Sequence, residues 1–180
     1  MQNTDEHKIW GFLYREIAKL KVIIDCYEKF FNNIEQKNNR YNEIFQIILD
    51  SFSSYVFVTV GKYFDKTKGS WSLYRFKLLN NKKIDKSRVL AQEFIDFRNN
   101  RTAHFSKNIT HSNNFIFLTD TGVSKVRNII DEINILMIEI NSLYGYNEGY
   151  ILDWIGTDSS IDNMLDDLKK YDHMKAFKES

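Results

Sequence analysis

The sequence contains no proline and only seven glycines in its 180 residues. Because proline ends helices and marks loops, its absence favours long helices joined by short connections. A single cysteine, Cys26, excludes a disulfide within the chain and is typical of a reducing compartment. Cys26 lies in an apolar pattern with helical spacing, so we interpret it as a core residue.

The chain also lacks a long hydrophobic run. The longest one, Tyr55–Val60, is interrupted by Thr59 and is far too short to cross a bilayer. The first residues, MQNTDEHK, are polar and acidic, which excludes a signal peptide at this position. Together with the single cysteine, these features lead us to expect a cytoplasmic protein.

Excess charge and cofactor motifs are missing as well. The net charge is +1, whereas a protein that held long duplex nucleic acid by charge alone would be more basic. A local basic cleft is still allowed. The four histidines are scattered and no pair has the spacing of a metal site. The chain has neither a phosphate-binding glycine loop nor a Gly-x-Ser-x-Gly motif, so we expect no metal and no other cofactor.

What the sequence does contain is apolar residues at helical spacing over long stretches. Hydrophobic residues make up 43% of the chain and aromatic residues 15%, which suits one globular domain spanning residues 1–180. We predict an all-α protein, specifically an antiparallel four-helix bundle with short additional helices. The four core helices are expected at residues 5–31, 41–64, 86–106 and 122–144.

Two connecting stretches are less clear. The β-branched run Tyr55–Val60 would also suit a strand, but we prefer a helix because the apolar positions on both sides of it stay in helical register. Residues 71–79 are predicted to form one or two helical turns. Residues 80–88 are predicted to form a lysine-rich loop. This loop is either a solvated connector or a positive rim that attracts phosphate through Lys82, Lys83 and Lys86.

The end of the chain also carries a helical pattern. Gly145 and Gly149 are expected to end the fourth core helix. Residues 150–155 are interpreted as a small aromatic patch around Trp154. Residues 158–171 are predicted to form a last amphipathic helix, capped at its start by polar residues.

The most unusual stretch is Ala91–Ser106. On a helix, its two arginines and its histidine fall within one arc of about 120° that also carries large apolar residues. Charged groups at the edge of an apolar face are rarely left unpaired, so these are either paired within the fold or gathered into a cleft or a subunit interface. The polar residues on this arc are Arg98, Arg101 and His104. The apolar residues on it are Phe94, Phe97 and Phe105, together with Leu90 just before the stretch.

The order Arg98-Asn99, followed by His104 six positions after the arginine, resembles the motif of the HEPN superfamily. In that superfamily the motif stands near the end of the third helix of a four-helix bundle. Together with the upstream segments KYFD (62–65) and SWSLYRFKLL (70–79), the stretch is similar to the branch found in phage abortive-infection systems. The resemblance covers most of Ile44–Ile140.

The resemblance implies metal-independent cleavage of RNA, such as tRNA or mRNA, by a toxin or phage-defence effector. Two protomers would bring their motif helices together in a homodimer, and the paired arginines and histidines would line a composite cleft. His104 would act as general base or acid, and Arg98 would hold the phosphate. Asn99 would orient His104 or the phosphate, and Arg101 would be a secondary phosphate contact.

One departure from the family concerns the antitoxin. Toxins of this superfamily that pair with a nucleotidyltransferase antitoxin usually have a tyrosine two residues after the histidine. This position is Ser106 here, which argues against that particular pairing. Another antitoxin protein remains open as a partner.

The same residues also allow a structural interpretation. His104 would then be a core histidine with its hydrogen bonds satisfied. Arg98 would pair with Asp96 or Glu93 in a local ion network. The protein would in that case be an inactive helical module that binds a protein partner or a nucleotide. A third interpretation is a regulator that senses nucleotides in the same cleft.

Overall fold

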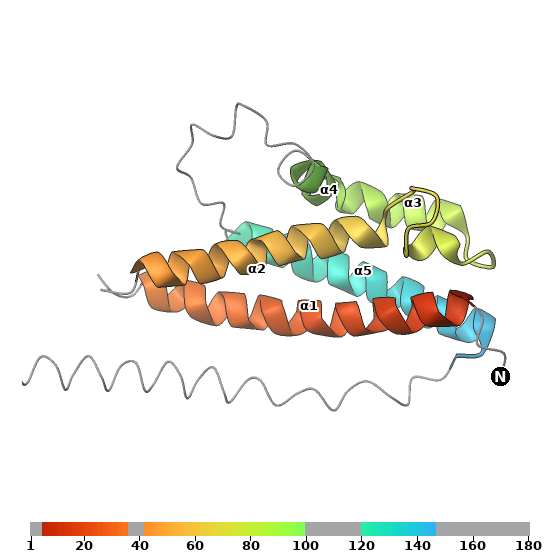
Figure 1. Cartoon of the computed structure of the whole chain (residues 1–180), viewed down its shortest axis with the longest axis horizontal. Coiled ribbons are helices and arrows are strands. Elements are labelled where there is room, and N and C mark those ends of the chain that lie inside the picture. Colours follow the sequence, from red (N-terminus) through yellow and green to blue (C-terminus); the bar gives the residue numbers. More distant parts are fainter. Residues whose placement is uncertain (1–4, 36–41, 100–119, 147–180) are drawn as a thin grey trace, which may run out of the picture.

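The computed structural model describes residues 5–35, 42–99 and 120–146, and all regular structure in these ranges is helical (Figure 1). The prediction of an all-α protein is confirmed for this part of the chain. In order, the elements are α1 Asp5–Glu35, α2 Asn42–Tyr63, the single 3-10 turn η1 Leu73–Arg75, α3 Asn81–Leu90, α4 Gln92–Arg98 and α5 Asp120–Tyr144.

The three long helices build most of the core. Helix α1 packs against both α2 and α5, and the three run side by side in Figure 1. Their apolar stripes meet in the interior, as the 3.6-residue spacing predicted. Six of the side chains that meet there have no exposed surface at all: Leu13, Leu20, Val56, Val60, Ile133 and Ile140.

The second half of α2 is helical, as predicted from its register, despite its β-branched residues. This half is not buried on all sides, although its apolar run Tyr55–Val60 is interrupted only by Thr59. Val56 and Val60 face the core, but Val58 points the other way and is 42% exposed. One side of α2 therefore remains at the surface of the described part of the molecule.

The predicted lysine-rich loop at residues 80–88 is wrong, because most of it is helix α3. The side chain of Asn80 caps the start of this helix by accepting a hydrogen bond from the Lys82 amide at 3.0 Å. Lysine is also a good helix former. Ile84 and Ser87, three residues apart, give α3 a narrow inner face that is too short to stand out in the sequence.

The predicted helix at residues 86–106 starts earlier and is interrupted at Ala91, where α3 ends and α4 begins. The interruption separates two residues that a continuous helix would place on one face. Phe94 is buried at 1% exposure, whereas Leu90 is 54% exposed. Helix α4 packs on α2, with the rings of Phe94 and Phe97 lying 5.5 and 4.2 Å from the ring of Phe57. Residues 100–106 lie outside the described residues.

Helix α5 agrees with the prediction within two residues, and Gly145 ends it as expected. Gly145 has a φ of 66°, and the Tyr146 amide then donates to the Asn141 carbonyl at 3.1 Å, which is a Schellman ending. Gly149, the aromatic patch around Trp154 and the helix predicted at 158–171 lie outside the described residues. No described helix combines the length and the hydropathy needed to span a membrane.

Candidate functional site

The candidate site is built around Arg98, the last residue of α4, whose side chain lies across α2 at Gly61. A Cβ atom at Gly61 would come within 2.7 Å of Arg98 Cδ and 2.9 Å of Arg98 Nε. Glycine inside a helix lowers stability relative to alanine, so it needs a local reason. Here the reason is that the missing Cβ lets the arginine lie close against α2. The Arg98 side chain is 22% exposed.

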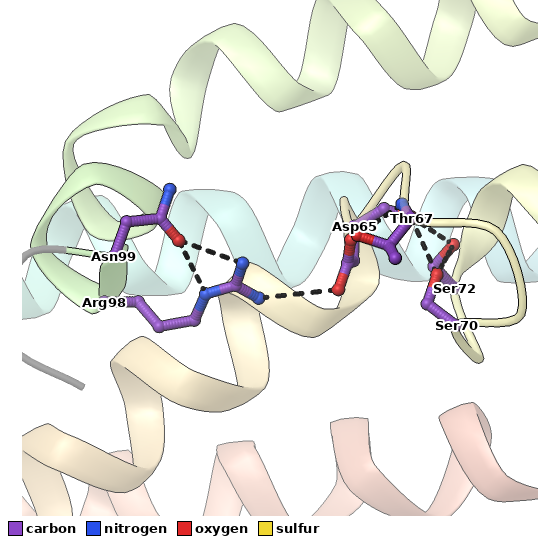
Figure 2. A network of polar contacts seen from close by, with 6 residues as sticks. All are labelled: Asp65, Thr67, Ser70, Ser72, Arg98 and Asn99. Carbon is purple, nitrogen blue, oxygen red and sulfur yellow. Dashed lines mark hydrogen bonds and ion pairs between the residues drawn. The ribbon is translucent and has the colours of Figure 1, made fainter. Parts of the chain in front are cut away.

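Asn99 and Asp65 both contact the guanidinium (Figure 2). Arg98 Nε and Nη2 both donate to Asn99 Oδ1, at 3.2 and 3.0 Å. Arg98 Nη1 lies 4.0 Å from Asp65 Oδ2, which is an ion pair at longer than hydrogen-bond distance. Because a guanidinium can only donate, these contacts require the oxygen of Asn99 to face Arg98. The guanidinium is thus oriented from both sides.

Asp65 belongs to the turn that follows α2, and this turn is internally bonded. Its Oδ1 accepts from the Thr67 amide at 2.9 Å. Its main-chain oxygen accepts from the hydroxyls of Ser70 and Ser72, at 3.1 and 2.7 Å. Gly69, with a φ of 89°, supplies the left-handed residue that closes the turn. The carboxylate that faces Arg98 is therefore fixed by its own loop (Figure 2).

The electrostatics of the pair favour the charged form of Asp65. Burial raises the pKa of the Asp65 carboxyl, but hydrogen bonds from the amide and hydroxyl of Thr67 and the positive charge of Arg98 outweigh it. The pKa consequently lies below its ordinary value. At neutral pH, Arg98 and Asp65 form a fully ionised pair that is partly exposed to solvent.

The two acids that the structural interpretation assigned to Arg98 have other partners. Glu93 Oε2 accepts from Lys125 Nζ of α5 at 2.7 Å. Asp96 Oδ1 accepts from Gln92 Nε2 at 2.7 Å. The acid beside Arg98 is instead Asp65, from the turn after α2, so the ion pair joins two parts of the fold rather than residues within α4.

The three predicted phosphate-binding lysines lie on α3, on the far side of the Ala91 break from Arg98. Lys82 and Lys86 are exposed. Lys83 Nζ forms an ion pair with Glu139 of α5 at 2.7 Å. The structure thus places these lysines on one helix, away from the contacts that surround Arg98.

His104 and Arg101 lie outside the described residues, so the pairing of Arg98 with the histidine remains a prediction. Sequence reasoning missed two residues of the network, Gly61 and Asp65. A glycine within an apolar helical run was a usable signal for Gly61, because it indicates a close approach. Asp65 ends the segment KYFD that contributes to the resemblance, but it is separated from Arg98 by 33 positions, and nothing in the sequence pairs the two residues.

The described residues include no group of three or more His, Cys, Asp or Glu side chains that could hold a metal ion. No protein-family model matches the chain, and neither a curated protein nor a solved structure matches it.

Proposed function

We propose that this protein is a metal-independent endoribonuclease of the HEPN type, with the four-helix bundle of that superfamily, acting as a toxin or phage-defence effector. The observation that supports this most is the setting of Arg98. Its guanidinium is oriented by Asn99 and Asp65 and lies in a notch left by Gly61, shortly before His104 in the chain. Such preorganisation is what a group that stabilises charge in a transition state requires.

The proposed reaction uses a nucleophile that RNA itself carries. The 2′-oxygen attacks the adjacent phosphorus, the bond from phosphorus to the 5′-oxygen breaks, and a 2′,3′-cyclic phosphate and a 5′-hydroxyl result. His104 removes the proton from the 2′-hydroxyl or delivers one to the leaving oxygen, since a histidine can exchange protons near neutral pH. Arg98 contacts the phosphate and balances its growing charge.

Asn99 has a narrower role in this proposal than the sequence alone suggested. Its amide oxygen accepts from Arg98, so it acts as a positioning residue for the guanidinium. Arg101 remains a secondary phosphate contact. One chain supplies a single set of Arg98 and His104, so the composite cleft forms only in a homodimer.

The test compares wild-type protein with Arg98→Ala and His104→Ala on total tRNA in the presence of EDTA. We expect wild-type cleavage to persist in EDTA and each substitution to slow it by about 10²–10⁴-fold. Arg15→Ala, which removes an exposed arginine of α1, is the matched control and should cleave like wild type. RNA left equally intact by wild type and variants, or cleavage abolished by EDTA, would contradict the proposal.

One observation favours a second candidate, an inactive helical module of the same fold that binds a protein partner or a nucleotide. Arg98 is already paired with Asp65 and hydrogen-bonded to Asn99, which is also how a structural arginine is held. Expression separates the two candidates, because a toxin should arrest growth and His104→Ala should relieve the arrest. Wild-type protein that leaves growth unaffected would favour the module.

A further inference from the structure

Charge is distributed unevenly along the chain. Residues 62–88 contain nine basic and two acidic side chains, a net charge of +7. Because the whole chain carries +1, all other residues together carry −6. The segment runs from the last turn of α2 through η1 and along α3, at the end of the helices where α2 meets the start of α3 (Figure 1). We call the basic side chains of residues 62–88 the basic surface.

Most of this charge is not neutralised by neighbours. Lys66 Nζ lies 2.8 Å from Asp85 Oδ1. Lys83 Nζ lies 2.7 Å from Glu139 Oε2. Five other cations of the segment are exposed and form no ion pair with any described residue. They are Lys68, Arg75, Lys77, Lys82 and Lys86. A concentration of exposed cations on a chain that is otherwise acidic attracts a polyanion.

The segment that carries the basic surface also carries an exposed aromatic ring. Trp71 is 44% exposed, and its ring packs nearly perpendicular to the ring of Phe12, with the ring centroids 5.4 Å apart. Its backbone is held in place because its two neighbours, Ser70 and Ser72, both donate hydrogen bonds to the carbonyl oxygen of Asp65 (Figure 2). A large apolar ring is thus presented to solvent from a fixed loop.

We infer that the basic surface binds a single-stranded nucleic acid, whose phosphates contact the exposed cations and one of whose bases stacks on Trp71. Lys62 adds a cation close to the stacking position, since its Nζ lies 4.1 Å from the centroid of the Phe12 ring that supports Trp71. Proteins that hold single strands without reading their sequence combine these two features, a cationic track and aromatic rings.

Other polyanions fit only one of the two features. A duplex offers phosphates, but its bases are already stacked and paired. An acidic peptide offers charge, but no flat ring for Trp71. That the strand is RNA rests on the proposed function. Asp65 joins the loop of Trp71 to Arg98, so the part of a bound strand that stacks on Trp71 would lie near the candidate site.

The experiment measures fluorescence anisotropy of a labelled 2′-O-methyl oligonucleotide of about twelve nucleotides, a probe that cannot be cleaved by 2′-oxygen attack. The full chain is titrated against it at several salt concentrations. We expect Trp71→Ala to weaken binding by about tenfold and Trp71→Phe, which keeps a ring, to weaken it less. Replacing Lys68, Lys82 and Lys86 together by glutamine should flatten the plot of log K against log salt by roughly two units.

Lys21→Gln on α1 is the matched control for lost charge, and it should bind like wild type. The inference is overturned if wild type does not bind the single strand, if Trp71→Ala binds as tightly as wild type, or if a duplex or polyglutamate binds as tightly as the single strand. Measuring the cleavage of unmodified RNA by the same variants separates this inference from the proposed function. Tight, Trp71-dependent binding without cleavage contradicts only the nuclease, whereas Arg98-dependent cleavage without any effect of Trp71→Ala on binding contradicts only this surface.

Discussion

Two polar networks in the described part of the molecule, one in the core and one at the end of α4, differ in charge. Within the core, Trp10 donates to the side-chain oxygen of Asn141, and the Tyr63 hydroxyl donates to the carbonyl oxygen of Leu13. Burial, with the nearby charge of Glu16, raises the pKa of Tyr63, so it stays neutral. These bonds join α1 to α5 and α1 to α2 without placing any charge in the interior.

At the end of α4, by contrast, two members of the polar network are charged and all three are at least partly exposed: Arg98, Asn99 and Asp65. Neutral buried hydrogen bonds specify how helices pack. Removing a charged group even partly from water costs free energy, and charged groups held in this way are often found at functional sites. Substitutions in the first region should therefore change mainly stability, and substitutions in the second mainly activity.

The largest loss of stability is expected for Phe94→Ala. Phe94 is 1% exposed and anchors α4 against Phe57, so its truncation should lower the free energy of unfolding by about 3–5 kcal/mol. Urea denaturation measures this. Leu90→Ala, at a 54% exposed position beyond the Ala91 break, is the control and should cost less than about 1 kcal/mol. Equal losses would mean that α3 and α4 form one continuous helix with a shared face.

A smaller loss is expected for Asn141→Leu. The substitution leaves the indole N–H of Trp10 buried without its acceptor, which should cost about 1–3 kcal/mol in the same assay. The exposed neighbour Ser142 provides the control, since Ser142→Ala should be nearly neutral. An unchanged stability for Asn141→Leu would show that this bond does not hold α1 against α5.

Asp65→Asn should change the pH dependence of stability more than stability itself. The folded-state pKa of Asp65 lies below its ordinary value of 3.8, so its contribution is present above about pH 4 and is lost as the pH falls through the folded-state pKa. At neutral pH the variant should lose up to about 1 kcal/mol, because the ion pair is partly exposed. Wild type and variant should converge on acidification. Parallel curves for the two proteins would contradict the charge assignment, and Asp131→Asn, at an exposed acid, is the control.

The smallest change in stability is expected for Gly61→Ala. Alanine favours a helix by up to about 1 kcal/mol, but its Cβ would displace the end of the Arg98 side chain, so the two effects should nearly cancel. Gly11→Ala on α1 meets no atom within 4 Å and should show the full gain. If the network serves catalysis, RNA cleavage should fall in Gly61→Ala alone. Equal gains in stability for both variants would show that Arg98 is not held against α2.

Much of the fold could be predicted from the sequence, because long amphipathic stripes and a glycine ending determine where α1, α2 and α5 lie. Helix α3 was missed because its inner face consists of only Ile84 and Ser87, and its partners come from other parts of the chain. The break at Ala91 was missed because Ala91 is itself a strong helix former. These features depend on tertiary contacts that periodicity does not report.

For the candidate site, the sequence offered Arg98 and Asn99 as candidate residues, but it did not predict which residues contact Arg98. The local acids Glu93 and Asp96 were the natural candidates within α4, yet Lys125 and Gln92 are their partners. Asp65 reaches Arg98 only because α4 packs on α2 beside the turn at its end. A contact between positions far apart in the chain depends on packing, which a single sequence does not encode in any local pattern.

The most direct test of the central claim, that Arg98 acts on RNA, is the rate at which wild type and Arg98→Lys cleave single-stranded RNA in EDTA, measured beside their thermal unfolding midpoints. Lysine keeps the charge but loses the planar fork that grips a phosphate. The account predicts cleavage by wild type, a rate lower by about 10²-fold for Arg98→Lys, and midpoints within a few degrees of each other. No cleavage by wild type, or equal rates for the two proteins, would contradict it.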